Sequence, residues 1–145
     1  TSGDLIASTT STLKRDGSAL CAFPNQPTGS FYIGVKSNNT IKTWSASPVS
    51  IGSTPITYQF SNSISKAYGN NLVQLNNGVF GLYSADLNDD GNVDNSDYSN
   101  WEVDANNFAF GFYTTDLNGD GNVDNSDFSI WETNNNNFIY SATPF

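Results

Sequence analysis

The chain has 145 residues, which is the size of one domain or two small ones. It contains 14 acidic and 5 basic residues and no His, and its formal net charge is −9. The lack of His excludes His-based acid–base catalysis and His-ligated zinc, and the single Cys excludes an internal disulfide. The acidic character argues against nucleic-acid binding, and no apolar run reaches the roughly 20 residues of a membrane span. The absence of Met, including at position 1, predicts a processed product or a fragment.

Charge divides the chain into two parts. Residues 1–83 contain five basic and two acidic residues, whereas residues 84–145 contain twelve acidic residues and no basic one. Such a shift in composition is typical of a domain boundary. We therefore expect one domain over 1–83 and a second over 84–145.

The first part predicts β-structure. Apolar and polar residues alternate over 31–35 and 56–60, which is the period of a half-buried strand. Turn signals such as Asn38-Asn39 separate the candidate strands, and Cys21 is expected in the core. We predict a mainly β protein with a small α part, its N-terminal domain being a small antiparallel β-sandwich. Shorter strand candidates lie at 19–23, 72–75 and 79–83.

The second part is a tandem repeat. DLNDDGNVDNSDYSNWE over 86–102 aligns with DLNGDGNVDNSDFSIWE over 116–132 at a shift of 30 residues. A unit that occurs twice in this way is a structural repeat. Each copy contains D-x-N-x-D-G-x-x-D-x-x-D, a twelve-residue loop with oxygen-bearing side chains at positions 1, 3, 5, 9 and 12 and Gly at the bend.

This spacing predicts two calcium ions, one in each loop. Ca²⁺ takes six to eight oxygen ligands, and a twelve-residue loop supplies them from these positions together with a main-chain carbonyl at position 7. The side chain at position 9 of each loop is expected to bind Ca²⁺ through a water molecule. The carboxylate at position 12 is expected to bind it with both oxygens. Asp89, at position 4, should point to solvent. The alternative is a pair of Asx-rich surface turns. The predicted ligands are Asp86, Asn88, Asp90, Asn92, Asp94 and Asp97 in the first loop, and Asp116, Asn118, Asp120, Asn122, Asp124 and Asp127 in the second.

A short helix is expected after each loop, over about 95–103 and 125–133. Each helix places two aromatic residues three apart on one face, which predicts an aromatic core shared by the two repeats. Val93 and Val123 occupy equivalent positions and are expected to join the loops by a β-bridge. The aromatic residues are Tyr98 and Trp101, then Phe128 and Trp131.

Loop-then-helix units in tandem with Asp at position 12 resemble the dockerin type I repeat pair, over residues 86–132. The resemblance implies two calcium sites at the ligands named above and docking onto a cohesin-like receptor. A wider stretch, including FYIGVKSNN and GVFGLYSADLNDDG, is similar to the C-terminal region of large secreted bacterial surface proteins. That similarity implies an exported, non-enzymatic module in which a β-sandwich, here lacking one strand ahead of Leu5, runs into a dockerin-like pair.

These features favour an extracellular or cell-surface structural module over an enzyme, because most acidic residues of the second part are predicted ligands. We expect copies of the chain to assemble by strand complementation, with residues 5–13 or 138–145 as the donor strand. A cohesin-like receptor is the alternative partner. A carbohydrate-binding module with a platform of Trp44, Tyr32 and Tyr58 is a third possibility, and the glycosylation sequon at Asn38 leaves an attached glycan open.

Overall fold

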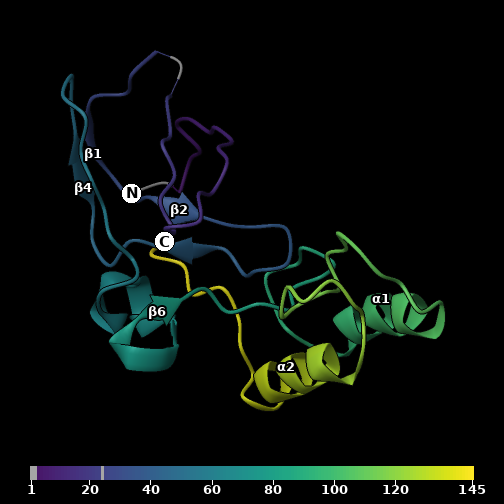
Figure 1. The fold of residues 1–145 in the computed structure, drawn as a ribbon. Helices are drawn as coiled ribbons and strands as arrows, with labels where there is room; N and C mark the ends of the chain where they lie inside the picture. The colour runs from purple at the N-terminus through teal and green to yellow at the C-terminus, as the bar shows by residue number, and fades with distance from the viewer. Residues whose placement is uncertain (1–2, 24) are drawn as a thin grey trace.

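The computed structural model describes residues 3–23 and 25–145. Within these residues, six short strands form three separate two-stranded antiparallel ribbons, which pair β1 with β4, β2 with β3 and β5 with β6 (Figure 1). The strands are β1 (Gly29–Phe31), β2 (Gly34–Val35), β3 (Thr43–Trp44), β4 (Val49–Ile51), β5 (Val73–Gln74) and β6 (Phe80–Gly81). Three 3-10 turns, η1 (Ile64–Lys66), η2 (Tyr68–Asn70) and η3 (Asn76–Gly78), and two helices, α1 (Asn95–Asn106) and α2 (Asn125–Asn136), complete the fold.

The predicted β-sandwich is wrong. Ribbons of two or three residues per strand do not form the two packed sheets that a sandwich requires. The predicted strand 31–35 is divided, because β1 pairs with β4 whereas β2 pairs with β3. The pairing changes partner at Tyr32 and Ile33, and residues 31–33 are all half-buried, so the predicted alternation of burial is not observed.

The predicted strand 56–60 is absent for a different reason. The Tyr58 hydroxyl donates to the carbonyl of Lys66 at 2.6 Å and accepts from the amide of Ala46 at 3.2 Å, and its ring packs against Phe60. The alternating aromatics therefore contact a turn instead of a neighbouring strand. Residues 19–23 also form no strand, and Cys21, predicted to be in the core, is exposed.

A small core joins the two predicted domains. Ile41 is fully buried with Ala85, Val93 and Trp131. The main chains meet at the same place, where the Ile41 amide donates to Tyr83 at 3.1 Å and the Ala85 amide donates to Asn39 at 2.7 Å. The charge boundary at 83/84 stays a prediction from composition, and the chain packs tightly across it.

Both helices begin at the predicted residue because an Asp starts each one. Asp94 accepts from the amide of Ser96, and Asp97 accepts from the amide of Asp94, which completes a capping box. Asp124 and Asp127 repeat this arrangement in α2. Each helix runs on to Asn106 or Asn136, past the predicted end. No helix of the described residues is long and apolar enough to cross a membrane.

Candidate metal centre

The two repeats pack through their aromatic residues, as predicted. The rings of Tyr98 and Trp131 lie 5.2 Å apart between centroids, and those of Trp101 and Phe128 are also 5.2 Å apart. Tyr98 additionally contacts Phe128 edge-on at 6.1 Å. These contacts hold α1 against α2 and fix the position of each loop relative to the other helix.

Each loop pairs with the segment that follows the helix of the other repeat. The Val93 amide in loop 1 donates to Ile139 at 2.9 Å, and the Val123 amide in loop 2 donates to Ala109 at 3.0 Å. The expected bridge between Val93 and Val123 is therefore wrong. Instead, the two valines make equivalent contacts, because each pairs with the segment that follows the helix of the other repeat.

Side-chain hydrogen bonds also join each helix to a residue that precedes the loop of the other repeat. In α2, the Asn134 amide donates to the carbonyl of Ser84, ahead of loop 1, at 2.9 Å. In α1, Asp104 accepts from the Thr115 hydroxyl, ahead of loop 2, at 2.7 Å. The loops are thus anchored to the repeat pair as a whole, and not only to their own helices.

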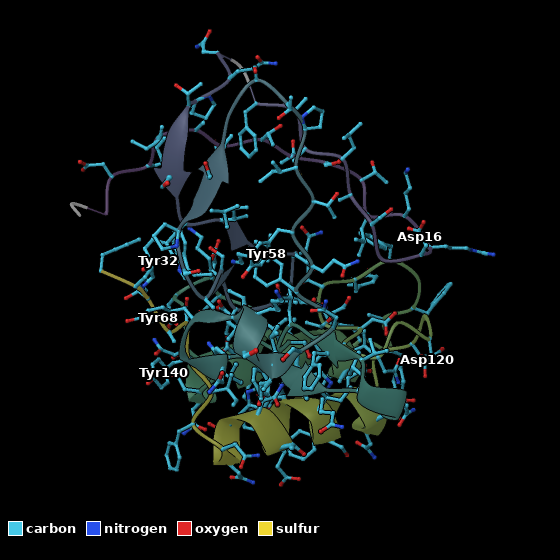
Figure 2. The ribbon with its side chains drawn as sticks, turned by 90° about the vertical axis from the view of Figure 1, so that its left-hand side faces the viewer. Asp16, Tyr32, Tyr58, Tyr68, Asp120 and Tyr140 are labelled. Carbon is cyan, nitrogen blue, oxygen red and sulfur yellow. The ribbon has the colours of Figure 1, made fainter. Side chains whose placement is uncertain are left out.

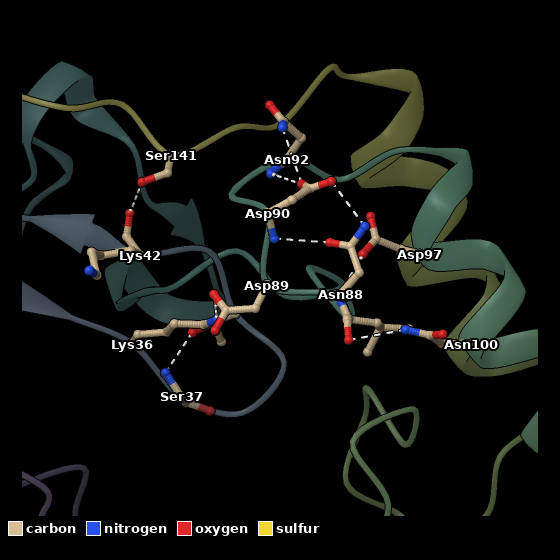
Figure 3. Close-up of polar contacts among 12 residues, drawn as sticks. Lys36, Ser37, Lys42, Asn88, Asp89, Asp90, Asn92, Asp97, Asn100 and Ser141 are labelled. Carbon is tan, nitrogen blue, oxygen red and sulfur yellow. Dashed lines mark hydrogen bonds and ion pairs between the residues drawn. The ribbon is translucent and has the colours of Figure 1, made fainter.

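Inside loop 1 the exposed polar side chains form consecutive Asx turns (Figure 3). Asn88 accepts from the amide of Asp90 at 3.0 Å, and Asp90 accepts from the amide of Asn92 at 2.9 Å. The pKa of Asp90 is lowered because its carboxylate accepts from the main-chain amide of Asn92 and from the side-chain amide of Asn88. Asn118, Asp120 and Asn122 form the same turns in loop 2, where the pKa of Asp120 is lowered by the same kind of bonds.

The carboxylates at position 12 lie inside the fold. Asp97 is fully buried and accepts from the amides of Leu87, Asn88 and Asp94 at 2.7, 3.1 and 2.9 Å. Burial raises its pKa, and these amides oppose the rise. Asp127 is equally buried and accepts from the corresponding amides. Both carboxylates therefore close their loops through the main chain.

Asp86, at position 1 of loop 1, is a buried carboxylate whose oxygens lack hydrogen-bond donors among the described residues. It is 1% exposed, and neither carboxylate oxygen accepts a hydrogen bond of normal geometry from the part of the chain that the structure describes. Burial raises its pKa, the positive charge of Lys36 opposes the rise, and the negative charge of Asp97 adds to it, while the Gly91 amide contributes only weakly. A buried carboxylate without a partner costs several kcal/mol, in the absence of a proton or a cation.

In loop 2 the equivalent residue, Asp116, accepts hydrogen bonds. Asp116 is half-buried and accepts from the amides of Gly119 and Gly121 at 2.8 and 2.9 Å. Gly119 has a φ of +77°, and its counterpart in loop 1 is Asp89, which adopts the same left-handed conformation with a φ of +65°. The two loops share a backbone path but differ in how position 1 is satisfied.

The structure thus brings Asp86 and Asp97 together inside loop 1 and leaves Asn88, Asp90, Asn92 and Asp94 at its exposed side. Within the described chain, no three acidic side chains converge on one point as metal ligands. Asn88, Asp90 and Asn92 are engaged with one another, and Asp94 caps α1. The predicted ligand sets therefore stay predictions, and the Asx turns of the alternative interpretation are present.

Sequence reasoning missed one charged partner of loop 1. Lys36, from the first part of the chain, forms an ion pair with Asp89 (Figure 3). Its positive charge also acts on Asp86, where it opposes the rise in pKa that burial causes. Asp89 is 78% exposed, as expected for position 4, yet it is not free of contacts. A lysine that is 53 residues from Asp89 in sequence gives no local signal of such a pair.

The aromatic residues of the predicted carbohydrate platform contact different partners. Tyr32 packs edge-on against Tyr68, whereas Tyr58 lies apart from this pair and contacts Phe60 (Figure 2). Trp44 packs against Phe145 at 5.1 Å and has Lys42 over its ring. Sugar binding by these three residues stays a prediction.

Comparisons with known protein families, with curated proteins and with solved structures find no match to this chain.

Proposed function

We propose that this chain is a non-enzymatic, extracellular module that holds two Ca²⁺ ions and is a subunit of a cell-surface or filamentous assembly. The observation that supports it most strongly is the buried carboxylate of Asp86, which has no hydrogen-bond partner for either oxygen. A divalent cation beside Asp86 would remove this cost by supplying both the opposite charge and the missing ligand.

The rest of loop 1 fits the same ion. Asp97 contributes a second buried carboxylate, and Asn88 and Asp90 hydrogen-bond only within the loop. They are therefore free to turn toward a cation without breaking a contact with another part of the molecule. Asn92 would offer its carbonyl, and Asp94 would act through water. In loop 2 the equivalent residues would hold the second ion.

The charge distribution supports a structural role for the two ions. Residues 84–145 contain twelve acidic and no basic residues, so mutual repulsion opposes their folding. The ion pair of Lys36 with Asp89 relieves this only at one loop. Two Ca²⁺ ions would convert repelling carboxylates into shared ligands, and binding energy would become folding energy.

A second candidate is docking of the repeat pair onto a cohesin-like receptor. Phe108 and Phe138 follow α1 and α2 at equivalent positions, and they are 86% and 83% exposed. Both adopt a left-handed conformation, with φ of +52° and +53°, which is uncommon for a residue other than Gly. Paired exposed aromatics of this kind favour a protein interface.

Chelation of the full chain tests the calcium proposal. We expect excess EDTA to reduce the circular dichroism signal of α1 and α2 and to shift the fluorescence of Trp101 and Trp131 to longer wavelength. Added Ca²⁺ should restore both signals, whereas Mg²⁺ should not, because it keeps its hydration shell. Spectra that do not change after complete removal of metal would contradict the proposal.

A further inference from the structure

Two segments of the chain have strand-type sequences but no main-chain hydrogen-bond partner among the described residues. Residues 5–13 contain Leu5, Ile6, Leu13 and three Thr, without Gly, Pro or charge, and residues 56–60 alternate Ile, Thr, Tyr, Gln and Phe. β-branched and aromatic residues of this kind favour strands. Within the described chain, no main-chain group of 5–13 or of 54–60 hydrogen-bonds to another main-chain group.

The N-terminal segment also exposes its apolar side chains. Leu5 is 78% exposed, Ile6 60% and Leu13 67%. In Figure 1 it is part of the purple trace without an arrow, which leads into β1. A β-prone segment with both an exposed apolar set and unpaired main-chain groups is a template for another strand.

The C-terminal tail, by contrast, is already held by its own chain. The Ser141 amide donates to Gly91 at 2.7 Å, and its hydroxyl donates to the carbonyl of Lys42 at 2.6 Å (Figure 3). Asn71 donates to the carbonyl of Tyr140 at 2.7 Å, and Phe145 packs against Trp44. Of the two donor segments expected from the sequence, the structure leaves the N-terminal one available.

We propose that residues 5–13 of one copy add as a β-strand to residues 54–60 of a second copy. This inference rests on the proposed function as an assembly subunit and names the contact that builds it. The two segments do not pair with each other within one chain, although neither has another main-chain partner within residues 3–23 and 25–145. Pairing between copies would satisfy the main-chain groups of both and cover Leu5, Ile6 and Ile56.

The geometry of such a contact produces a filament. Donor and acceptor are different segments, so the contact is heterologous, and each added copy presents a new acceptor and a new donor. Nine residues in extended conformation span about 30 Å, which is sufficient to reach across an adjoining copy. A turn, in which the Lys14 amide donates to Ser18 at 2.8 Å, connects the donor segment to the rest of the chain.

Matched substitutions in the full chain test the donor. In Ca²⁺, we expect the wild-type chain to form filaments seen by electron microscopy and light scattering. Leu5→Asp should reduce assembly by more than tenfold. Leu20→Asp is the control, because Leu20 is 79% exposed but lies outside the donor segment, and it should assemble as the wild type does. A synthetic peptide of residues 3–13 in excess should shorten the filaments, and a scrambled peptide should not.

Cysteine pairs identify the acceptor and the chain to which it belongs. In a Cys21→Ser background, chains with Thr9→Cys and chains with Thr57→Cys are mixed and oxidised, and mass spectrometry should find disulfides between the two kinds of chain. An internal disulfide in a monomeric chain that carries both substitutions would show pairing within one copy and overturn the proposal.

Two further results would also overturn the proposal. One is assembly that Leu5→Asp leaves unchanged, and the other is a wild-type chain that binds Ca²⁺ but stays monomeric. If the chain binds no Ca²⁺ and the crosslink between copies still forms, the calcium proposal fails while the strand contact stands.

Discussion

The indole Nε1 of Trp131 donates to the main-chain carbonyl of Asp94 at 3.1 Å and thereby ties helix α2 to the loop of the other repeat. Trp101 occupies the equivalent position in α1, but its buried Nε1 has no hydrogen-bond partner among the described residues. The two repeats are nearly identical in sequence, yet this connection is made on one side only. Loop 1 is thus the more firmly anchored of the two.

Replacing each Trp by Phe should show this asymmetry. Trp131→Phe removes a hydrogen bond and should lower the free energy of unfolding by about 1–2 kcal/mol beyond the loss of packing. Trp101→Phe removes a similar volume but also a donor that has no acceptor, so its loss should be smaller. Urea unfolding of both variants measures the difference. An equal loss, or a greater one for Trp101→Phe, would contradict the one-sided connection.

The carboxylate at position 12 should be essential for each ion. Asp97→Asn keeps the side-chain shape but removes the charge and one carboxylate oxygen. It should weaken calcium binding at loop 1 by at least about tenfold, equivalent to about 1.4 kcal/mol, and leave one ion bound at loop 2. Asp127→Asn should have the reverse effect.

Glu102→Gln is the matched control for these two variants, because Glu102 lies in the same repeat but outside the loop. Calorimetric titration should find two sites in this control. Two undisturbed sites in Asp97→Asn would show that Asp97 serves only to cap the loop and the helix.

Lys36 should compete with the ion of loop 1. It pairs with Asp89, which is mostly exposed, and its charge partly offsets the rise that burial causes in the pKa of Asp86. Lys36→Gln should destabilise the metal-free chain by about 0.5 kcal/mol and strengthen calcium binding about twofold at low salt. Both effects should shrink as salt is added.

Lys42→Gln removes an equal charge at a lysine that lies over the ring of Trp44, and it should leave calcium affinity nearly unchanged. Weaker binding in Lys36→Gln would mean that Lys36 helps to shape the loop and does not compete with the ion.

The tail after α2 should support loop 1 in preference to loop 2. Deleting residues 139–145 removes the partner of Val93, the Ser141 contact with Gly91 and the ring of Phe145 on Trp44. We expect calcium binding to weaken at loop 1 and to stay near the wild-type value at loop 2, where Val123 pairs with Ala109. Equal weakening of both sites would indicate general unfolding.

The sequence was sufficient for the parts of the fold that local chemistry determines. Asp94 and Asp124 mark the start of each helix because a side-chain cap acts on the next residues along the chain. The aromatic residues spaced three apart predicted the contact between α1 and α2. The helix ends were missed because Asn107 and Asn137 extend each helix by donating back to Val103 and Thr133.

The parts that the sequence did not determine depend on distant partners. Apolar and polar residues do alternate in 56–60, but the Tyr58 hydroxyl hydrogen-bonds to the main chain of Ala46 and Lys66, and the segment does not pair with a neighbouring strand of the described chain. Two further features likewise depend on how the chain folds back. They are the pairing of each loop with the segment after the other helix, and the ion pair of Lys36 with Asp89. Asp86 and Asp116 occupy the same position in their repeats, yet of these two only Asp86 is buried without a hydrogen-bond partner among the described residues.

Calcium titration of the chelated full chain, with native mass spectrometry and circular dichroism on the same samples, tests the central claim most directly. We expect two Ca²⁺ ions per chain, with helical signal that rises as they bind. Asp86→Asn should remove one ion and, in the metal-free state, make the chain more stable than the wild type, because it removes a buried charge without a partner. Intact helices with no calcium bound at millimolar concentration would contradict the account.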